Sequence, residues 1–318
     1  MSSSLRPIVV ILGPTASGKS ALGMELADRC GGEIVNADAL QVYRGLDIGT
    51  AKPPSEDLQA VRHHLIDILD PEERFSAGDF ARRARQAISD IQERERAAIV
   101  VGGSGLYIRA LLEGISPIPP GDESVREELR QRCEAEGLAV LREELIQLDP
   151  ETAERIAPSD TQRTLRGLEV ALVSGRPLSE WVRERPFGES RLRALRIGLT
   201  LPRAILYDRI SVRVNEMIAC GWVQEVAAML EKGIKPGVPA FQAIGYRQLV
   251  RHLEGELSLD EAIADIVRAT KRYAKRQMTW FRKEEDIQWF PAGEVRGAIP
   301  SMLQDFGLLE ESFSNEQT

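Results

Sequence analysis

Residues 13–20 have the sequence GPTASGKS, and this glycine-rich stretch constrains the fold more than any other feature of the chain. Gly13 is followed by four residues and then by Gly18, Lys19 and Ser20, which is the spacing G-x-x-x-x-G-K-[ST]. An apolar run, residues 7–12, precedes the motif, and a helical pattern follows it. Backbone N–H groups of such a loop point inward, and the helix N-terminus adds positive potential. We therefore predict a phosphate-binding loop between a strand and a helix.

Short β-branched runs alternate with amphipathic stretches through the first hundred residues. The strands are expected at residues 8–12, 33–35 and 97–101, and the helices at about 19–30 and 77–95. Continuous apolar runs are typical of strands buried on both faces. This βαβ rhythm predicts an α/β fold, a P-loop parallel sheet flanked by helices.

The rhythm breaks at 114–124, where prolines and glycines cluster. The helices expected next cover about 123–136, 138–148 and 160–173, with Asp160 as N-cap and Gly175 as C-terminal stop. A strand at 193–201 and further helices follow. We therefore predict an α/β core of residues 1–113 plus 193–318 and an all-helical insertion domain at 114–192. The acid-rich tail beyond 284 is expected to be solvated and partly frayed.

Composition limits the cellular compartment and the kinds of binding partner that we expect for this protein. Among 318 residues, 43% are hydrophobic and 28% are charged, which is usual for a globular protein. The formal net charge of −8 does not by itself indicate a polyanion partner. Three cysteines (Cys30, Cys133 and Cys220) lie far apart and are expected to be free thiols. Without a signal peptide or a run of about 20 apolar residues, we expect a cytoplasmic monomer with no membrane contact.

A carboxylate is missing where a nucleotide hydrolase would place its metal ligand. The strand at 97–101 leads into Gly102, Gly103 and Ser104, none of which is acidic. Asp38 is the acidic residue that directly follows an early strand, so it is expected at the sheet edge where ligands bind. Its position is compatible with a general base, a metal-linked group or a structural cap.

Two adjacent histidines, His63 and His64, suggest a metal site at first sight. Successive side chains of a strand point to opposite faces, so this pair cannot chelate one ion. The third histidine of the chain is His252, far along the sequence. We therefore expect structural or substrate-loop roles for the pair.

Basic side chains concentrate in two segments. Residues 266–283 carry seven lysines and arginines and no acid, and their apolar residues form a helical stripe. Seven like charges repel one another and favour a polyanion partner over an ordinary solvated face. Lys275 and Arg276 are candidate contacts there. In the insertion, Gln162 and the arginines of "QRTLR" are suited to hydrogen-bond splayed bases and phosphates.

With these positions assigned, the chain resembles the tRNA dimethylallyltransferases (tRNA isopentenyltransferases). The strings that carry the resemblance run in order over nearly the whole chain: "GPTASGKS" at 13–20, "DALQVYRGLDIGTAKP" at 38–53, "HHLIDILDPEERFSAGDF" at 63–80, "VVGGSGLYIRALLEG" at 100–114, "DTQRTLRGLEV" at 160–170, "IGYRQL" at 244–249 and "RYAKRQMTWFRK" at 272–283. Many families share the first string, whereas the second is highly specific.

The resemblance implies transfer of a dimethylallyl group from dimethylallyl diphosphate to N6 of the adenosine 3′ to the anticodon, with release of diphosphate. Mg²⁺ is the expected cofactor, held by Ser20, and Asp38 and Ser104 are the expected catalytic residues. The diphosphate would be bound by Gly13, Pro14, Thr15, Ala16, Ser17, Gly18, Lys19 and Ser20. Contacts to the tRNA anticodon stem-loop are expected from Asp38, Ala39, Leu40, Gln41, Ser104, Arg126, Gln162, Arg163, Thr164, Leu165, Arg166, Gln242, Ala243, Ile244, Gly245, Tyr246, Arg247, Lys275 and Arg276.

Three positions depart from the family pattern. Ser104 replaces the usual threonine and keeps the hydroxyl, whereas Ala39 replaces serine and lacks a hydrogen bond beside Asp38. Arg62 stands where proline often precedes the histidine pair. The alternative function is a P-loop small-molecule or nucleoside kinase, which would use the same loop and Asp38 as a base toward a hydroxyl.

Overall fold

A single parallel sheet organises the larger part of the chain. The computed structural model describes residues 6–116, 118–184 and 192–306. Six strands lie in the order β3-β2-β4-β1-β5-β6, and each neighbouring pair is parallel. The strands are β1 (Ile8–Leu12), β2 (Glu33–Ala37), β3 (His63–His64), β4 (Ala98–Gly102), β5 (Ala194–Thr200) and β6 (Ile287–Pro291). The predicted α/β class is confirmed.

Helices make up most of the rest. The first group is α1 (Lys19–Cys30), α2 (Ser55–Ala60), α3 (Ala77–Glu93) and α4 (Gly105–Glu113). The insertion holds α5 (Glu123–Glu136), α6 (Leu138–Leu148), α7 (Pro150–Arg155), α8 (Thr161–Ser174) and α9 (Leu178–Glu184). The last group is α10 (Arg203–Ala219), α11 (Trp222–Glu231), the 3₁₀ turn η1 (Pro239–Gln242), α12 (Tyr246–Leu253), α13 (Leu259–Phe281) and α14 (Val295–Asp305).

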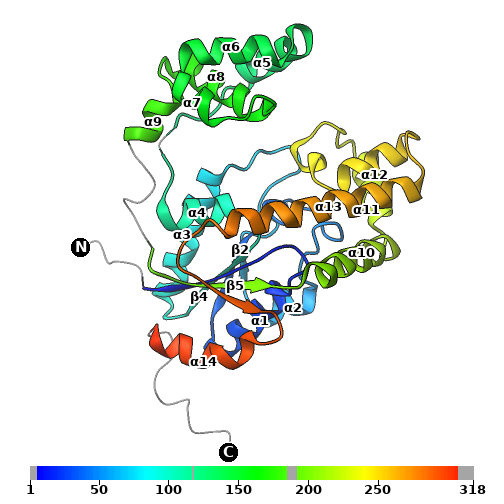
Figure 1. The fold of residues 1–318 in the computed structure, drawn as a ribbon. Helices are drawn as coiled ribbons and strands as arrows, with labels where there is room; N and C mark the ends of the chain where they lie inside the picture. The colour runs from blue at the N-terminus through cyan, green and yellow to red at the C-terminus, as the bar shows by residue number, and fades with distance from the viewer. Residues whose placement is uncertain (1–5, 117, 185–191, 307–318) are drawn as a thin grey trace, which may run out of the picture. The chain divides into compact units, whose positions relative to one another are not determined.

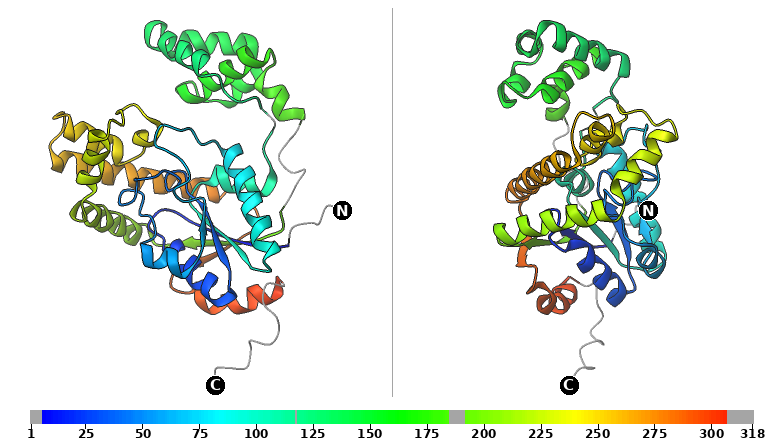
Figure 2. Two further views of the ribbon diagram at one scale, coloured as in Figure 1. Left: turned by 180° about the vertical axis from the view of Figure 1, so that it is seen from behind. Right: turned by 90° about the vertical axis from the view of Figure 1, so that its right-hand side faces the viewer.

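Helices cover both faces of the sheet (Figures 1 and 2). Ile8 and Val10 of β1 pack with Phe80 of α3 and other residues of α3 and α4. The alternate residues of β1 pack against α1 and α14 on the opposite face. Burial on both sides explains why the two central strands, β1 and β4, are apolar at every position rather than at every second one.

A third apolar cluster forms beside the sheet. It joins α10, α11, α12 and α13 to the segment that follows β2, whose Val42 and Leu46 are completely buried. Trp222, Tyr246 and Ile266 supply the helical side of this cluster. The segment after β2 is therefore held by helices that come much later in the sequence.

The chain divides into two compact units, one of Met1–Leu112 with Leu192–Thr318 and one of Glu113–Arg191. Both division points fall one residue before the boundaries predicted from the sequence. The second unit has a core of its own around Leu141, Leu145 and Leu168. Its helix α8 begins after Asp160, whose carboxylate accepts from the N–H of Arg163, and ends at Gly175 in the left-handed conformation. Both predicted caps of this helix are thus confirmed.

The region beyond 284 differs from the expectation of a solvated, frayed tail. Residues 287–291 form the edge strand β6, and α14 buries Val295, Ile299 and Leu303 against the sheet. The many acids mask an apolar stripe in α14, which is why charge content alone was misleading. Residues 307–318 of the tail lie outside the described residues. Across 6–116, 118–184 and 192–306, none of the helices combines the length and apolarity required to cross a bilayer.

Packing of α14 predicts a difference between two isoleucines. Ile299 is 1% exposed, whereas Ile205 of α10 is 46% exposed. Ile299→Ala is expected to lower the free energy of unfolding by about 2–5 kcal/mol, because it removes buried methyl groups and leaves a cavity. Ile205→Ala is the matched control and should change it by less than about 0.5 kcal/mol. Urea unfolding measures both, and equal effects would contradict the docking of α14.

Candidate active site

The phosphate loop lies between β1 and α1, as its sequence predicts. Gly18 precedes α1 with φ of 93°, a left-handed conformation that glycine adopts without strain. No side chain caps the first turn of α1, so its N–H groups remain available to a ligand. The Lys19 ammonium donates to the carbonyl of Pro14 at 3.4 Å. This geometry suits an oxyanion at the start of α1.

The ammonium of Lys19 lies in a strongly perturbed environment. Burial lowers the pKa of Lys19 to about 8; the negative charge of Asp38 opposes this shift, and the positive charge of Arg213 adds to it. Burial likewise lowers the pKa of Arg213, and Asp38 again opposes the change. The charges of Lys19, Arg213 and Asp38, which come from three different parts of the chain, therefore influence one another electrostatically.

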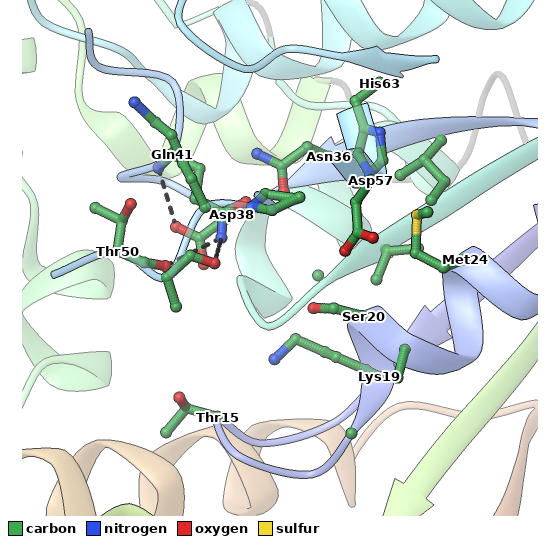
Figure 3. Close-up of a pocket in the computed structure, with 18 of the residues that line it drawn as sticks. Thr15, Lys19, Ser20, Met24, Asn36, Asp38, Gln41, Thr50, Asp57 and His63 are labelled. Carbon is green, nitrogen blue, oxygen red and sulfur yellow. Dashed lines mark hydrogen bonds between the residues drawn. The ribbon is translucent and has the colours of Figure 1, made fainter. Parts of the chain in front are cut away.

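Two cavities meet at these three residues. The loop cavity, of about 310 Å³, is lined by Ser20, Asn36, Asp57 and His63 among others. The helix cavity, of about 360 Å³, is lined by residues of α10, α11 and α13. The residues common to both are Thr15, Ala16, Lys19, Asp38, Thr50 and Arg213. Figure 3 shows Lys19, Ser20 and Asp38 around the loop cavity, with Thr15 and Thr50 at its margin.

Asp38 follows β2 directly and lines both cavities. Its Oδ1 accepts from the N–H of Leu40 at 2.8 Å and from the N–H of Gln41 at 3.4 Å. The structural role left open by the sequence is therefore present, because the carboxylate holds the turn after β2. These bonds also fix the direction of the carboxyl group toward the junction of the cavities.

Helix α13 supplies a second set of polar groups. Gln277 is 6% exposed; its Oε1 accepts from the N–H of Thr15 and its Nε2 donates to the carbonyl of Gly103, both at 2.9 Å. Burial raises the pKa of Tyr273 to about 12, the charge of Asp38 adds to the rise, and a hydrogen bond with Ser104 opposes it. The loop and the turn after β4 are thus bonded to one helix, and the Asp38 carboxylate acts electrostatically on Tyr273 of the same helix.

The predicted RNA contacts of the larger unit separate into three groups. Ala39, Leu40, Gln242, Ala243, Ile244 and Arg276 line the helix cavity, whereas Gln41 lines the loop cavity. Arg247 and Lys275 are exposed. Gly245 is buried, and Tyr246 is completely buried and donates its hydroxyl hydrogen to Glu225 at 2.6 Å. Tyr246 therefore presents no surface to an RNA and serves the packing of its own unit.

The predicted contacts of the smaller unit separate in a similar way. Gln162 and Arg163 are exposed at the start of α8. Thr164 is completely buried, and Leu165 packs against the core of this unit. The side chains that pair with the buried carboxylate of Glu169 are Arg126 and Arg166, both at 2.7 Å.

Sequence reasoning missed Arg213, Tyr273 and Gln277 as members of the site. Arg213 lies on α10 without any local motif, so only the packing of α10 beside the loop reveals it. Tyr273 and Gln277 lie in the basic segment that the sequence did single out. The available signal was a glutamine in the apolar stripe of this helix, between Ala274 and Phe281, because an amide buried there needs partners.

The two histidines lie as the alternation of a strand predicts. His63 lines the loop cavity, and its Nδ1 lies 2.8 Å from the carbonyl oxygen of Val61. His64 faces away, with Nε2 2.7 Å from the carboxylate of Glu33.

The donor set around the loop cavity fits a phosphate-bound Mg²⁺ better than a protein cage. In the described parts of the chain, no three His, Cys, Asp or Glu side chains are grouped so as to hold a metal ion. The hydroxyl of Ser20 and the carboxylate of Asp57 do line one cavity, and Figure 3 shows them facing each other. Mg²⁺ in phosphate sites usually takes one or two protein oxygens and completes its shell with phosphate and water.

Comparison with known proteins identifies the family. The model of the IPP transferase family matches residues 41–284. A tRNA dimethylallyltransferase of Geobacter metallireducens is 50% identical over 296 residues, which is 93% of this chain and 95% of that protein. One of Syntrophobacter fumaroxidans is 48% identical over 299 residues, covering 94% of this chain and 87% of that protein. The chain belongs to the IPP transferase family.

Solved structures of the family agree with this assignment. The full-length tRNA isopentenylpyrophosphate transferase of Bacillus halodurans matches with a TM-score of 0.68 at 37% identity, covering 95% of this chain and 98% of that one. A eukaryotic dimethylallyltransferase studied acting on tRNA matches with a TM-score of 0.77 at 27% identity, covering 92% and 75%. The chain is therefore an enzyme with the fold of this family.

The bridge made by Gln277 yields a prediction for anion binding. Gln277→Leu leaves the N–H of Thr15 and the carbonyl of Gly103 without their buried partner, which costs about 1–3 kcal/mol for each group. We expect inorganic diphosphate to bind roughly 10-fold more weakly, because part of this cost falls on the loop. Gln224→Leu, at an exposed position of α11, is the control. Titration calorimetry measures both, and equal affinities would show that the bridge does not shape the loop.

Proposed function

We propose that this IPP transferase moves a dimethylallyl group from dimethylallyl diphosphate to N6 of the adenosine 3′ to the anticodon of a tRNA, releasing diphosphate. The observation that carries the proposal is the junction of two cavities at Lys19, Asp38 and Arg213. A reaction between an anionic donor and a nucleobase requires two neighbouring compartments with a basic group between them. The names of the relatives, tRNA dimethylallyltransferases, describe transfer of a dimethylallyl group to a tRNA and support the proposal to that extent.

The loop cavity suits the diphosphate of the donor. Backbone N–H groups at the start of α1, the Lys19 ammonium and the Arg213 guanidinium lie around the cavity in which negative charge would grow as the carbon–oxygen bond breaks. Mg²⁺, held by Ser20 with phosphate oxygens and water, would neutralise part of that charge. Lys19 and Arg213 already line this cavity, so both positive charges lie close to the expected place of the leaving diphosphate.

The helix cavity suits the adenine. Its wall combines apolar side chains with Tyr273, Arg276 and Gln242, which can stack on a base or hydrogen-bond to its edges. N6 forms a bond to C1 of the allyl group while the C1–oxygen bond breaks and its electron pair leaves with diphosphate. The carboxylate of Asp38 accepts the proton that N6 loses. Ser104 is hydrogen-bonded to Tyr273, which lines the helix cavity, and would affect the reaction through that side chain.

The acceptor is recognised through exposed basic and polar groups. Lys275 lies on the outer side of α13, and Arg276 of the same helix also lines the helix cavity. In the smaller unit, Gln162 and Arg163 are exposed on α8. An adenosine in a single-stranded loop leaves its stack at a cost of a few kcal/mol, which phosphate contacts can offset.

The direct test incubates the protein with unmodified tRNA, Mg²⁺ and dimethylallyl diphosphate, and then analyses the digested nucleosides by mass spectrometry. We expect prenylated adenosine together with released diphosphate. Transfer of label from the γ-phosphate of ATP to a small acceptor, without prenylated adenosine, would support the kinase alternative and overturn the proposal.

The variant Asp38→Asn distinguishes the two roles of this side chain, as proton acceptor in the reaction and as cap of the turn after β2. The asparagine oxygen can still accept from the N–H groups of Leu40 and Gln41, so the turn should persist. Loss of the base is expected to lower kcat by about 10²–10⁴-fold, with little change in tRNA affinity. Single-turnover kinetics and filter binding measure the two quantities. A near-normal rate would show that another group removes the N6 proton.

The lowered pKa of Lys19 predicts how donor affinity depends on pH. The free protein loses the Lys19 proton as the pH rises through about 8, whereas bound diphosphate favours the charged ammonium. We compare the affinity of the wild type for dimethylallyl diphosphate, measured without tRNA, with that of Lys19→Arg. The ratio of the two affinities should be constant below pH 7. Above pH 8 it should fall by up to about tenfold per pH unit, because the arginine of the control stays charged. A constant ratio between the two proteins up to pH 9.5 would contradict this role of Lys19.

A further inference from the structure

A carboxylate outside the cavities holds the segment that forms one wall of the loop cavity. Glu225 of α11 accepts from the N–H groups of Asp47 and Ile48 through Oε2, at 2.8 and 2.7 Å. Its Oε1 accepts from the N–H of Gly49 at 3.3 Å and from the hydroxyl of Tyr246 at 2.6 Å. Three successive backbone donors on one carboxylate form an anchor with charge-assisted hydrogen bonds.

The indole of Trp222 closes the other side of this anchor. A Cβ atom at Gly49 would lie 2.0 Å from Nε1 of Trp222, and one at Gly245 would lie 2.0 Å from its Cη2. The ring therefore fits between two glycines. It also packs edge-on against the ring of Tyr246, with the two ring centroids 5.6 Å apart. Glycine is needed at both positions because any side chain would displace the indole or the backbone.

The anchored residues lead directly into the cavity wall. Thr50 to Pro54 line the loop cavity, and the carbonyls of Thr50 and Ala51 accept from the side-chain amide of Gln41, at 3.0 and 3.1 Å. Gln41 in turn belongs to the turn that Asp38 caps. A continuous chain of bonds thus runs from Glu225 through residues 47–51 to Asp38.

We propose that Glu225, supported by Tyr246 and Trp222, is a positioning residue that sets the place of residues 47–54 against the diphosphate of the donor. This rests on the proposed function in that the loop cavity is taken to hold the diphosphate. Glu225 lines neither the loop cavity nor the helix cavity. Its effect on the reaction passes through the backbone that it holds.

The test compares Glu225→Gln with Glu231→Gln, an exposed glutamate on the same helix. The amide introduced by Glu225→Gln cannot accept on both of its terminal atoms, so some of the bonds to 47–49 are lost. We expect faster amide hydrogen exchange in a peptide spanning 47–49, roughly 10-fold weaker binding of inorganic diphosphate and a raised KM for dimethylallyl diphosphate. The control should match the wild type in all three measurements.

Two more variants keep the proposal open to refutation. Tyr246→Phe removes one bond of four and should give a smaller shift in diphosphate affinity. Gly49→Ala pushes the segment away from Trp222 without changing Glu225, so it should weaken diphosphate binding even if Glu225→Gln fails to fold. A role in folding alone predicts lower unfolding midpoints with unchanged diphosphate affinity and KM, and this result would overturn the proposal. Absence of diphosphate binding by the wild type would instead refute the proposed function.

Discussion

The candidate active site depends first on the electrostatic attraction between the carboxylate of Asp38 and two cations, Lys19 and Arg213. The carboxylate comes from the end of β2, the ammonium from the start of α1 and the guanidinium from α10. Partial burial strengthens each of these electrostatic effects, because less water screens them. The parallel sheet brings Lys19 and Asp38 together, since the carboxyl ends of its strands share one edge.

Two helices far along the chain keep this arrangement in place. Gln277 of α13 links the phosphate loop to the turn after β4, and Glu225 of α11 holds the segment that follows β2. Both helices also contribute to the helix cavity. The helical elements after β5 therefore support both compartments, whereas the smaller unit has a core of its own.

Local signals were strong enough to predict most of the larger elements. The phosphate loop, the strands of the central sheet and the caps of α8 follow from spacing, apolar runs and turn residues. The part of the tail at 287–305 was predicted wrongly, because its acids were given more weight than the apolar stripe of α14. Asp38 was expected at the site because it follows a strand, which is a local feature.

The missed members of the site depend on contacts between distant segments. Arg213, Tyr273 and Gln277 lie on amphipathic helices whose sequences do not show which loop they will contact. The same holds for Glu225, which lies outside both cavities. Tyr246 illustrates the opposite error, because it was predicted to contact RNA from its place in a family motif and is completely buried. Resemblance of short strings predicts that such residues matter, but whether they contact a ligand or support the fold is decided by tertiary packing.

A crystal structure with Mg²⁺, inorganic diphosphate and an anticodon stem-loop RNA would show whether the two cavities hold the leaving group and the acceptor base. We expect diphosphate against residues 13–20, with an extruded adenine in the helix cavity and its N6 within hydrogen-bonding distance of the Asp38 carboxylate. An RNA bound without any base in that cavity, or a diphosphate held away from the loop, would contradict this expectation.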